Sequence, residues 1–448
     1  MDPPARIKVR HDLLPGRRFS ARTSSSARLC SILVSLVAHL IFMHFWSFLA
    51  LAAAAAEWGL WCLLVGPPAS PLWHVLGPAG LAVVNRLAAE ACDTERHRAP
   101  ILGRAGALLL AVGFGATVAC LGVVTLWLTF GLHQLMASPA QAGPLLAAPA
   151  GSGPTEFDVA ARLLVVATGL VMTYGYVHGH RRLRVRERAL PLAGLPPALE
   201  GFRLVHLSDL HLGPLADRKA TRDVFDRVSA LDADLVCITG DIIDNPWTDV
   251  DSWIPELRRL RARHGVVAIL GNHDRYSDAD RVAAAIRRLT DVRLLRDEVL
   301  ALDCGGRSLH VIGIEDRAPS HTGTLLPQLA ARVPPGAPVV VLAHHPDAFD
   351  AAVTAGLPLT LAGHTHGGQL AVPGLRHLNM ARLLVTHRDV GWFRSEGYRM
   401  HVSAGLGVSG QRIRLGVPRD VTVIRLTRSA RGRPAGSRAQ SARHVRGS

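Results

Sequence analysis

The first 180 residues and the rest of the chain have different hydrophobic patterns. Apolar runs over Ser31–Ala56, Ala105–Leu132 and Ala160–Val177 have the length that a helix needs to cross a bilayer of about 30 Å. A fourth span is expected between Trp58 and Val84, where prolines and glycines interrupt the run. The pattern therefore predicts an α-helical transmembrane region over residues 31–178, with about four helices.

Arginine-rich segments and segments without arginine alternate along this region. Arginines crowd residues 1–30, the stretch from Arg86 to Arg104 and the stretch from Arg181 to Arg188, whereas residues 133–161 contain no Lys or Arg. Because short basic segments stay in the cytoplasm, we expect a multi-pass protein of the cell membrane. Its basic N-terminus (1–30) and its C-terminal domain would then both be cytoplasmic. Arg17-Arg18 also fits a twin-arginine export signal, which would place the domain outside, but the apolar run that follows is too long for one.

From Phe202 onward, short β-branched runs alternate with amphipathic segments. Residues 179–198 are predicted to form a linker, 199–427 a folded domain and 428–448 a disordered basic tail. The expected strands are 202–207, 234–238, 266–270, 308–314, 338–342, 357–361, 401–403 and 421–426. The expected helices are 217–231, 251–263, 277–289 and 347–355, with Asp217 and Ser277 as N-caps. Alternating strands and helices predict an α/β domain with a central sheet, followed by a second and more antiparallel sheet.

Five polar motifs follow successive apolar strands. They are Asp209-Leu-His211, Gly240-Asp241-Ile-Ile-Asp244, Gly271-Asn272-His273-Asp274, His344-His-Pro346 and Gly363-His364-Thr-His366. Each motif alone also fits an ordinary polar turn. Binding sites on open α/β sheets form at the carboxyl ends of strands, so five such ends would bring these side chains together. Because Asp, Asn and His bind hard and borderline divalent ions, the set favours a metal-dependent hydrolase.

The formal charge of +15 also fits a nucleic-acid-binding protein. Many of the basic residues, however, lie beside apolar runs, where they set topology and contact anionic headgroups. We therefore expect membrane lipids as partners and no nucleic acid. The six cysteines have no spacing typical of a disulfide framework or a zinc site, so we expect free thiols.

The five motifs together resemble those of the calcineurin-like metallophosphoesterase superfamily. The sequences Gly-Gly-Gln369 and Ser403-Ala-Gly405-Leu-Gly407 resemble its membrane-associated bacterial branch, although Pro418-Arg419-Asp420 departs from a Pro-Pro-Glu run common there. The resemblance covers about residues 199–426. It implies a four-layer α/β/β/α sandwich, here preceded by the transmembrane region, with two divalent metal ions at one edge.

The resemblance also implies a role for each ligand. Asp209, His211 and His366 would bind one ion, Asn272, His344 and His364 the other, and Asp241 would bridge both. Such ligands suit Mn, Fe or Zn, and the sequence does not choose among them. His273 would protonate the leaving group and Asp244 would orient His273, while Asp274 is expected to be a turn or cap residue.

These inferences predict a membrane-anchored phosphoesterase. A metal-bridging hydroxide would cleave a phosphodiester or phosphomonoester, and membrane anchoring makes a lipid-linked substrate attractive beside a soluble nucleotide. A different class of function is a membrane transporter or sensor whose phosphoesterase-like domain binds metal without turnover. Against it, the ligand set is complete and His39, His44 and Glu57 are the few ionisable residues in the first apolar region.

Overall fold

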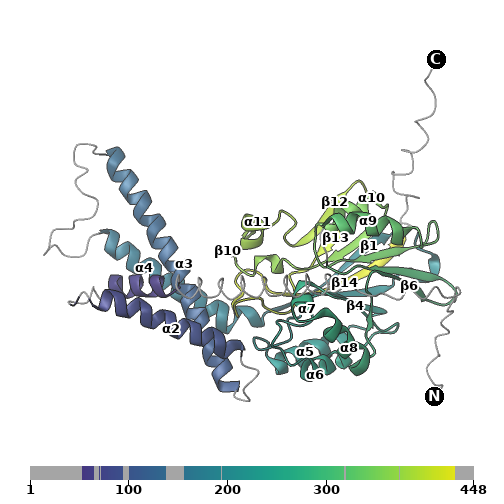
Figure 1. Ribbon diagram of the computed structural model, residues 1–448. Helices are drawn as coiled ribbons and strands as arrows, with labels where there is room; N and C mark the ends of the chain where they lie inside the picture. The colour runs from purple at the N-terminus through teal and green to yellow at the C-terminus, as the bar shows by residue number, and fades with distance from the viewer. Residues whose placement is uncertain are drawn as a thin grey trace, which may run out of the picture. The chain divides into compact units, whose positions relative to one another are not determined.

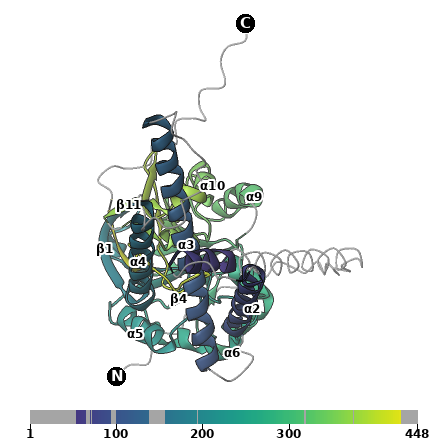
Figure 2. The ribbon, with the colours of Figure 1, turned by 90° about the vertical axis from the view of Figure 1, so that its left-hand side faces the viewer.

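The computed structural model describes residues 53–64, 70, 72–93, 100–137, 156–192, 194–316, 319–372 and 374–428. The helical region contains a helix over Ala53–Leu64, then α2 (Trp73–Asp93), α3 (Pro100–Ala137) and α4 (Glu156–Val177). Figure 2 shows α3 and α4 side by side. Among the described residues, the one helix long and apolar enough to cross a membrane is Phe157–Arg181, and 11% of its most apolar window is buried.

The expected membrane spans are only partly covered by this description. Residues 31–52 of the first span lie outside the described residues, whereas α3 includes the whole run Ala105–Leu132. Leu121, Leu163 and Leu170 are exposed on α3 and α4, as lipid-facing side chains would be. The number of passes and the cytoplasmic orientation stay predictions.

The first sheet has six strands in the order β1-β14-β2-β3-β4-β5. Their bounds are β1 (Leu183–Leu192), β2 (Arg203–Leu207), β3 (Leu235–Thr239), β4 (Val266–Ile269), β5 (Arg293–Leu294) and β14 (Arg419–Arg428). Strands β2 to β5 pair in parallel, and β14 pairs antiparallel to β2. The sequence predicted a linker where β1 lies. Instead β1 pairs in parallel with β14 along ten residues, from Leu183 opposite Arg419 to Leu192 opposite Arg428.

The second sheet has the order β12-β13-β9-β8-β7-β6. Its strands are β6 (Glu298–Asp303), β7 (Ser308–Gly313), β8 (Val339–Leu342), β9 (Leu359–Ala362), β12 (Gly391–Ser395) and β13 (Tyr398–Val402). The four central strands are parallel, and the pairs β6–β7 and β12–β13 at the edges are antiparallel. The second sheet is therefore the more antiparallel one, as predicted. Strands β10 (Ala371–Val372) and β11 (Leu375–Asn379) form a separate hairpin.

Helices cover both sheets (Figure 1). The chain places α5 (Arg218–Ser229), α6 (Val250–Trp253), η5 (Ile254–Arg259), α7 (Asn272–Tyr276) and α8 (Ala279–Leu289) among the strands of the first sheet. It places α9 (Pro319–Ala330), α10 (Ala348–Thr354), η6 (His366–Gly368) and α11 (Met380–Leu384) among those of the second. The short 3₁₀ turns η3 (Gly179–Arg181) and η4 (Pro197–Leu199) precede β1 and β2.

The strands bury both of their faces, which explains their continuous apolar sequences. Along β2, Val205 packs with the cluster under α5, α6 and α8, whereas Leu204 packs with Leu309 and Leu359 of the second sheet. A third cluster joins the second sheet to α9 and α10. Each fully buried aliphatic side chain stabilises the fold by about 1.5–3 kcal/mol relative to exposure. The polar site is thus held at the ends of strands that packing fixes on both faces.

Side-chain capping agrees with one expected helix start and corrects another. Asp217 caps α5, because its carboxylate accepts a hydrogen bond from the backbone N–H of Ala220 at 3.1 Å. The predicted cap Ser277 instead follows the end of α7. Asp278 caps α8, accepting bonds from the N–H groups of Asp280 and Arg281. The short helix α7 ends at Tyr276, directly before Ser277, and has no apolar period that could reveal it.

Candidate metal centre

The five polar motifs meet where strands of both sheets end. Asp209 follows β2, Asp241 follows β3 and Asn272 follows β4 in the first sheet. In the second sheet, His344 follows β8 and His364 follows β9. Segments as far apart in sequence as residues 209 and 364 therefore become neighbours, and the His364 N–H donates to Asp209 Oδ1 at 2.9 Å. The predicted convergence at strand ends is present in the structure.

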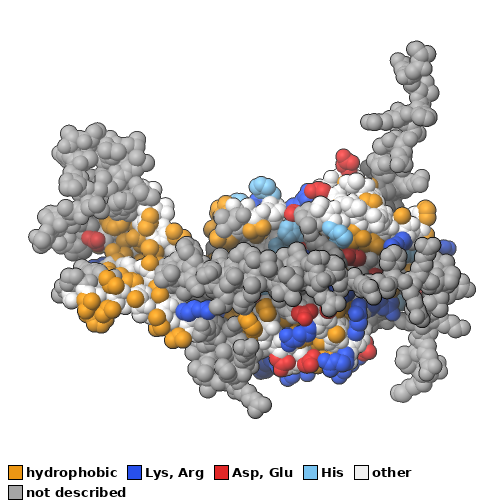
Figure 3. Space-filling model, in the orientation of Figure 1, with side chains coloured by type: hydrophobic (Ala, Val, Ile, Leu, Met, Phe, Trp, Pro, Cys, Tyr) orange, Lys and Arg blue, Asp and Glu red, His pale blue; other side chains and the backbone are white. Residues whose placement is uncertain are grey.

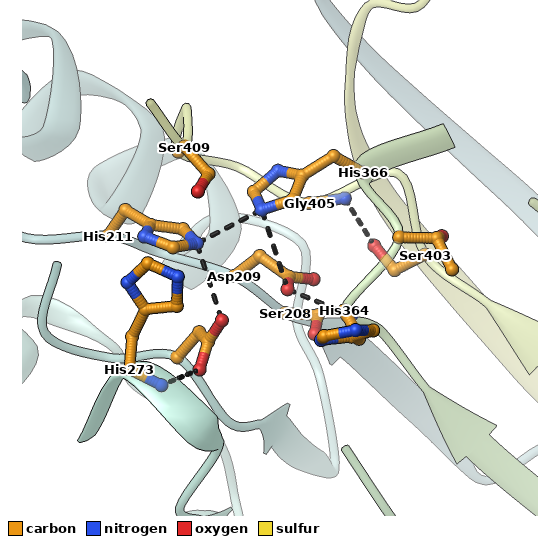
Figure 4. A network of polar contacts seen from close by, with 12 residues as sticks. Ser208, Asp209, His211, His273, His364, His366, Ser403, Gly405 and Ser409 are labelled. Atoms are coloured by element: carbon orange, nitrogen blue, oxygen red, sulfur yellow. Dashed lines mark hydrogen bonds and ion pairs between the residues drawn. The ribbon is translucent and has the colours of Figure 1, made fainter. Parts of the chain in front are cut away.

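Asp209, His211 and His366 form the first group, and all three side chains are buried. The Nε2 atoms of His211 and His366 lie 3.0 Å apart, and His366 Nε2 lies 3.8 Å from Asp209 Oδ1. Figure 4 shows the two imidazole rings pointing toward one another beside Asp209. This is the set that the sequence predicts for one ion.

Asp241, His344 and His364 form the second group, and Asn272 joins it. Asn272 Oδ1 lies 2.9 Å from His344 Nε2 and 3.0 Å from His364 Nδ1. The same two ring nitrogens are 3.3 Å apart. One oxygen and two nitrogens therefore converge on one place, as three ligands of one ion would.

Asp241 lies between the two groups. Its Oδ2 is 3.5 Å from His211 Nε2 of the first group and 3.3 Å from His344 Nε2 of the second. Its Oδ1 accepts a hydrogen bond from the backbone N–H of His273 at 2.9 Å. A single carboxylate oxygen thus faces both groups, which is the position that a bridging ligand requires.

An unpartnered oxygen shows that these residues fit a cation. Asp209 Oδ2 is fully buried and has no hydrogen-bond partner among the described residues. A buried carboxylate oxygen without a partner is costly, and a divalent ion beside His211 and His366 would satisfy it. The absence of Cys from the groups and the mixture of oxygen and nitrogen atoms match Mn, Fe or Zn.

Five of the seven candidate ligands have left-handed backbone. The residues with positive φ are Asp209 (50°), His211 (43°), Asp241 (51°), His364 (70°) and His366 (51°). For a residue with a Cβ, such a conformation costs on the order of 1–3 kcal/mol. The surrounding packing holds the backbone in this conformation, which directs successive side chains back toward the strand ends.

Glycines leave room next to the ligands, as the motifs predict. A Cβ on Gly363 would lie 1.8 Å from Ser208 Oγ and 2.4 Å from Asp209 Oδ2. A Cβ on Gly271 would lie 2.3 Å from Asp241 Oδ1. Any side chain at these positions would displace a candidate ligand.

The buried carboxylates and imidazoles shift one another's ionisation. Burial lowers the pKa of His344, but the facing carboxylates of Asp241 and Asp209 outweigh burial and raise that pKa to about 10. Burial raises the pKa of Asp241, whereas His344 outweighs burial and holds that pKa well below its usual range. Burial, then the charges of His344 and His345, lowers the pKa of His364 to about 3. His344 and Asp241 thus form a buried ion pair in the protein without metal.

Asp244 contacts two histidines, His211 through its side chain and His273 through its backbone. Its carboxylate Oδ1 accepts from His211 Nδ1 at 2.9 Å, whereas its backbone carbonyl accepts a short hydrogen bond from His273 Nδ1. The Asp244 carboxylate also lies within 4.8 Å of a His273 ring nitrogen, so the orientation of His273 by this side chain stays a prediction. The turn after Asp241 directs the carboxylate toward the first motif, so Asp244 orients a candidate ligand, as acidic residues behind metal-binding histidines commonly do.

Asp274 caps the start of α7. Its carboxylate accepts hydrogen bonds from the backbone N–H groups of Gly271 (2.9 Å), Ile242 (3.1 Å) and Ile243 (2.8 Å). Burial, together with the charge of Asp241, raises the pKa of Asp274 to about 7. Asp274 thereby joins the second and third motifs through the backbone, which agrees with its expected role as a cap.

Arg414 belongs to none of the motifs but contacts the site. Its guanidinium is fully buried, and Nη2 lies 3.3 Å from His366 Nδ1. The same group donates to the carbonyls of Ala404 (2.8 Å) and Gly407 (2.7 Å). Burial, then the charges of His211 and Arg414, lowers the pKa of His366 well below its usual value, which favours the neutral form that binds metals. The one feature of the sequence that could have indicated this contact is the presence of a charged residue between two aliphatic ones, Ile413 and Leu415.

A cavity of about 520 Å³ opens beside the second group. Asn272, His344 and His364 line this cavity, together with residues that include Arg275, Tyr276, His345, Asp316 and Thr322. Arg275 donates to the Asp316 carbonyl at 3.0 Å, so a backbone oxygen already engages this cation. Gln369 and Ser409 exchange two hydrogen bonds, which gives Gln369 a structural role in a turn.

The chain is similar to proteins that are named for a metallophosphoesterase domain. Residues 202–368 match the model of the calcineurin-like phosphoesterase family. A transmembrane protein with metallophosphoesterase domain from Danio rerio is 28% identical over 274 residues, which cover 58% of this chain and 61% of that protein. An uncharacterized metallophosphoesterase of Bacillus subtilis is 27% identical over 267 residues, covering 57% of this chain and 91% of that protein.

A solved structure, the NAD nucleotidase of Haemophilus influenzae, has a TM-score of 0.32 and 13% identity, with 46% of this chain and 45% of that chain covered. That likeness is too weak to place this chain. The residues that match the family model, by contrast, include all five motifs, from Asp209 to His366. Residues 202–368 are therefore similar to the calcineurin-like phosphoesterases, and this similarity suggests a hydrolase that acts on phosphate esters.

Proposed function

We propose that this protein is a membrane-anchored phosphoesterase that requires two divalent metal ions. The observation that carries the proposal is the position of Asp241, whose one oxygen faces His211 on one side and His344 on the other. Asp209, His211 and His366 would hold one ion, and Asn272, His344 and His364 the other. The ions would be Mn, Fe or Zn, because the donors are oxygen and nitrogen atoms.

The bound ions would neutralise phosphate charge and lower the pKa of water so that hydroxide forms near neutral pH. The protein's own groups support the reaction around them. His273 is half-buried at the edge of the site, and its Nδ1 donates to the Asp244 carbonyl, which leaves Nε2 to give a proton to the leaving oxygen. The Asp244 carboxylate fixes the ring of His211 through Nδ1, so that Nε2 faces the site.

The fold proposed for the catalytic part is the four-layer α/β/β/α sandwich. Support comes from the three hydrophobic clusters. One lies between the helices and the first sheet, one between the two sheets, and one between the second sheet and its helices. In this arrangement the strand ends of both sheets open at one edge, where the candidate ligands lie.

Membrane anchoring by several helices, with the domain in the cytoplasm, is the second part of the proposal. It is supported by the apolar helix Phe157–Arg181, by the placement of arginines and by relatives named transmembrane proteins. Tethering raises the local concentration of a site at a surface. A lipid-linked phosphate ester is therefore our favoured substrate.

The test is hydrolysis by the full chain in detergent, loaded in turn with Mn, Fe and Zn. Bis-p-nitrophenyl phosphate reports on diesters and p-nitrophenyl phosphate on monoesters. We expect turnover that a chelator abolishes and that added metal restores. Full occupancy of both ions without turnover of either ester would refute the enzyme and favour a metal-binding sensor.

A further inference from the structure

Exposed apolar side chains concentrate in one segment of the phosphoesterase domain. Among the described residues from 179 onward, the large hydrophobic side chains that are exposed are Tyr276 and six others, all between residues 372 and 385. These six form what we call the apolar patch: Val372, Leu375, Leu378, Met380, Leu383 and Val385. They lie on and next to β10, β11 and α11, and Figure 3 shows orange side chains gathered there. The exposed fractions reach 66% for Leu383 and 65% for Val385.

The apolar patch is held firmly against the candidate metal centre. Asn379 caps α11 by accepting from the Arg382 N–H at 2.9 Å, and it also bonds the carboxylate of Asp389. The Asp389 carbonyl in turn accepts from the hydroxyl of Thr365, between the candidate ligands His364 and His366. A Cβ on Gly368 would lie 2.4 Å from the backbone nitrogen of Ala381, so the backbones are in close contact. These contacts fix the position of the apolar patch relative to the candidate metal centre.

A short segment, residues 413–416, connects the apolar patch to the end of α4. On one side, the Ala371 N–H donates to the Leu415 carbonyl at 2.8 Å, just before Val372 of the patch. On the other side, the Arg414 N–H reaches the Gly175 carbonyl at 3.4 Å. The Arg414 carbonyl lies so close to Gly179 that a Cβ there would be 1.8 Å away. The patch thus lies one segment from the end of the helix that is apolar enough to cross a membrane.

The charges around the apolar patch suit an anionic surface. Residues 371–388 contain three Arg and two His but no Asp or Glu, although Arg382 pairs with Asp389 and Arg388 with Asp350 from outside this segment. At the end of α4, Tyr174 and Tyr176 precede a run of arginines that begins at Arg181. Aromatic residues followed by arginines mark the boundary between a membrane and the cytoplasm. Exposed apolar residues with a basic rim are typical of segments that lie about 5–10 Å deep in the headgroup region.

We propose that the apolar patch inserts into the headgroup region of the bilayer that α4 enters. Its occupant is the anionic phospholipid surface, and the candidate metal centre then faces lipid headgroups at a fixed height. The proposal rests on the membrane anchoring proposed above but not on catalysis. Phosphate ester groups at the membrane surface would reach the site without leaving the bilayer.

The experiment uses the full chain in vesicles of phosphatidylcholine and phosphatidylglycerol. The photoreactive amino acid benzoylphenylalanine replaces Leu383 in one variant and Ala284 in a matched control. Ala284 is exposed on α8, which packs on the first sheet. After irradiation, mass spectrometry should find phospholipid attached at position 383 and little or none at position 284. Attachment at 383 to a second copy of the chain or to another segment of it would overturn the proposal, as would equal lipid attachment at both positions.

Two controls separate this proposal from the proposed function. A His273→Ala variant, inactive under our mechanism, should still attach lipid at position 383. Failure of the chain to float with vesicles would overturn the membrane anchor and the patch together, whereas flotation without lipid attachment overturns the patch alone.

An activity measurement completes the test. The double variant Leu383→Asp, Val385→Asp should lose roughly tenfold in kcat/KM for a phosphate ester embedded in vesicles. The same variant should keep its activity on bis-p-nitrophenyl phosphate, and Ala284→Asp should change neither activity. Equal loss on both substrates would show that the patch supports the fold instead of membrane contact.

Discussion

Asn272 and His273 are adjacent in sequence but have different proposed roles. Asn272 Oδ1 lies among candidate ligand nitrogens, whereas His273 Nδ1 is held by the Asp244 carbonyl. Asn272→Ala should therefore lose one ion in metal analysis. His273→Ala should keep both and lose about 10²–10⁴-fold in kcat, because it removes only the acid. The loss should be largest for poor leaving groups, and the exposed His377→Ala serves as control. Loss of metal from His273→Ala would refute the acid role.

Asp244 offers a second test at the residue scale. Because its carboxylate holds His211, Asp244→Asn should weaken metal binding by roughly 10–100-fold. This change is measured by titrating the metal-free protein with metal and monitoring either activity or the heat of binding. Asp226→Asn, which removes an exposed carboxylate paired with Arg259, should leave metal affinity unchanged. A normal affinity with lower kcat would instead favour the predicted pairing of Asp244 with His273.

The ion pair of His344 and Asp241 makes the stability of the metal-free protein depend on pH. The pKa of His344 is raised to about 10 in the fold. Its stabilisation is therefore fully present below the unfolded value of about 6.5 and is lost as pH rises through 10. With chelator present, Tm should fall between pH 7 and 10, by about 2–4 °C for each kcal/mol lost. Metal binding should tighten over the same range, because the proton on His344 must leave. A similar slope in His344→Gln would contradict this origin.

The motif residues could be found from the sequence because each follows a short apolar strand. The hydrophobic pattern of a few neighbouring residues is enough to locate where such a strand ends. The partner of Asp244 could not be found, because the direction of its side chain depends on a turn that only the folded chain defines. Arg414 was missed for a related reason. Its contact with His366 spans 48 positions, and no spacing rule applies to a lone arginine.

At the scale of elements, β1 is the largest difference between prediction and structure. Its sequence, LRVRERALPL, reads as a basic linker because its charged residues face solvent at a sheet edge. Leu190 and Leu192 are nevertheless buried between the sheets. A strand in which apolar and polar residues alternate is hard to distinguish from a linker when arginine and proline interrupt the pattern.

A fragment that begins at residue 199 should fold poorly. It lacks β1, leaves the ten-residue edge of β14 unpaired and removes Leu190 and Leu192 from the core. Each leucine contributes about 1.5–3 kcal/mol, and an open edge promotes aggregation. Size-exclusion chromatography and thermal unfolding should show a monomer with higher Tm for residues 179–428 than for 199–428. Equal Tm values would mean that β1 adds nothing to the domain.

At the scale of the whole molecule, the placement of arginines predicts which side of the membrane the domain occupies. In inverted vesicles, the phosphoesterase domain should be cut by added protease, and in right-side-out vesicles it should be protected. Immunoblots against a C-terminal tag measure both. Protection in inverted vesicles would favour the export alternative suggested by Arg17-Arg18.

The left-handed backbone at Asp209, His211, Asp241, His364 and His366 affects how substitutions at these positions change stability and activity. Glycine adopts this conformation without strain, so a change from a ligand to glycine can relax the backbone while it removes activity. At the histidine positions of this set, screens that reward heat resistance alone would then enrich inactive proteins. For the same reason, glycine at His364 or His366 would separate the loss of a ligand from any added strain in the backbone.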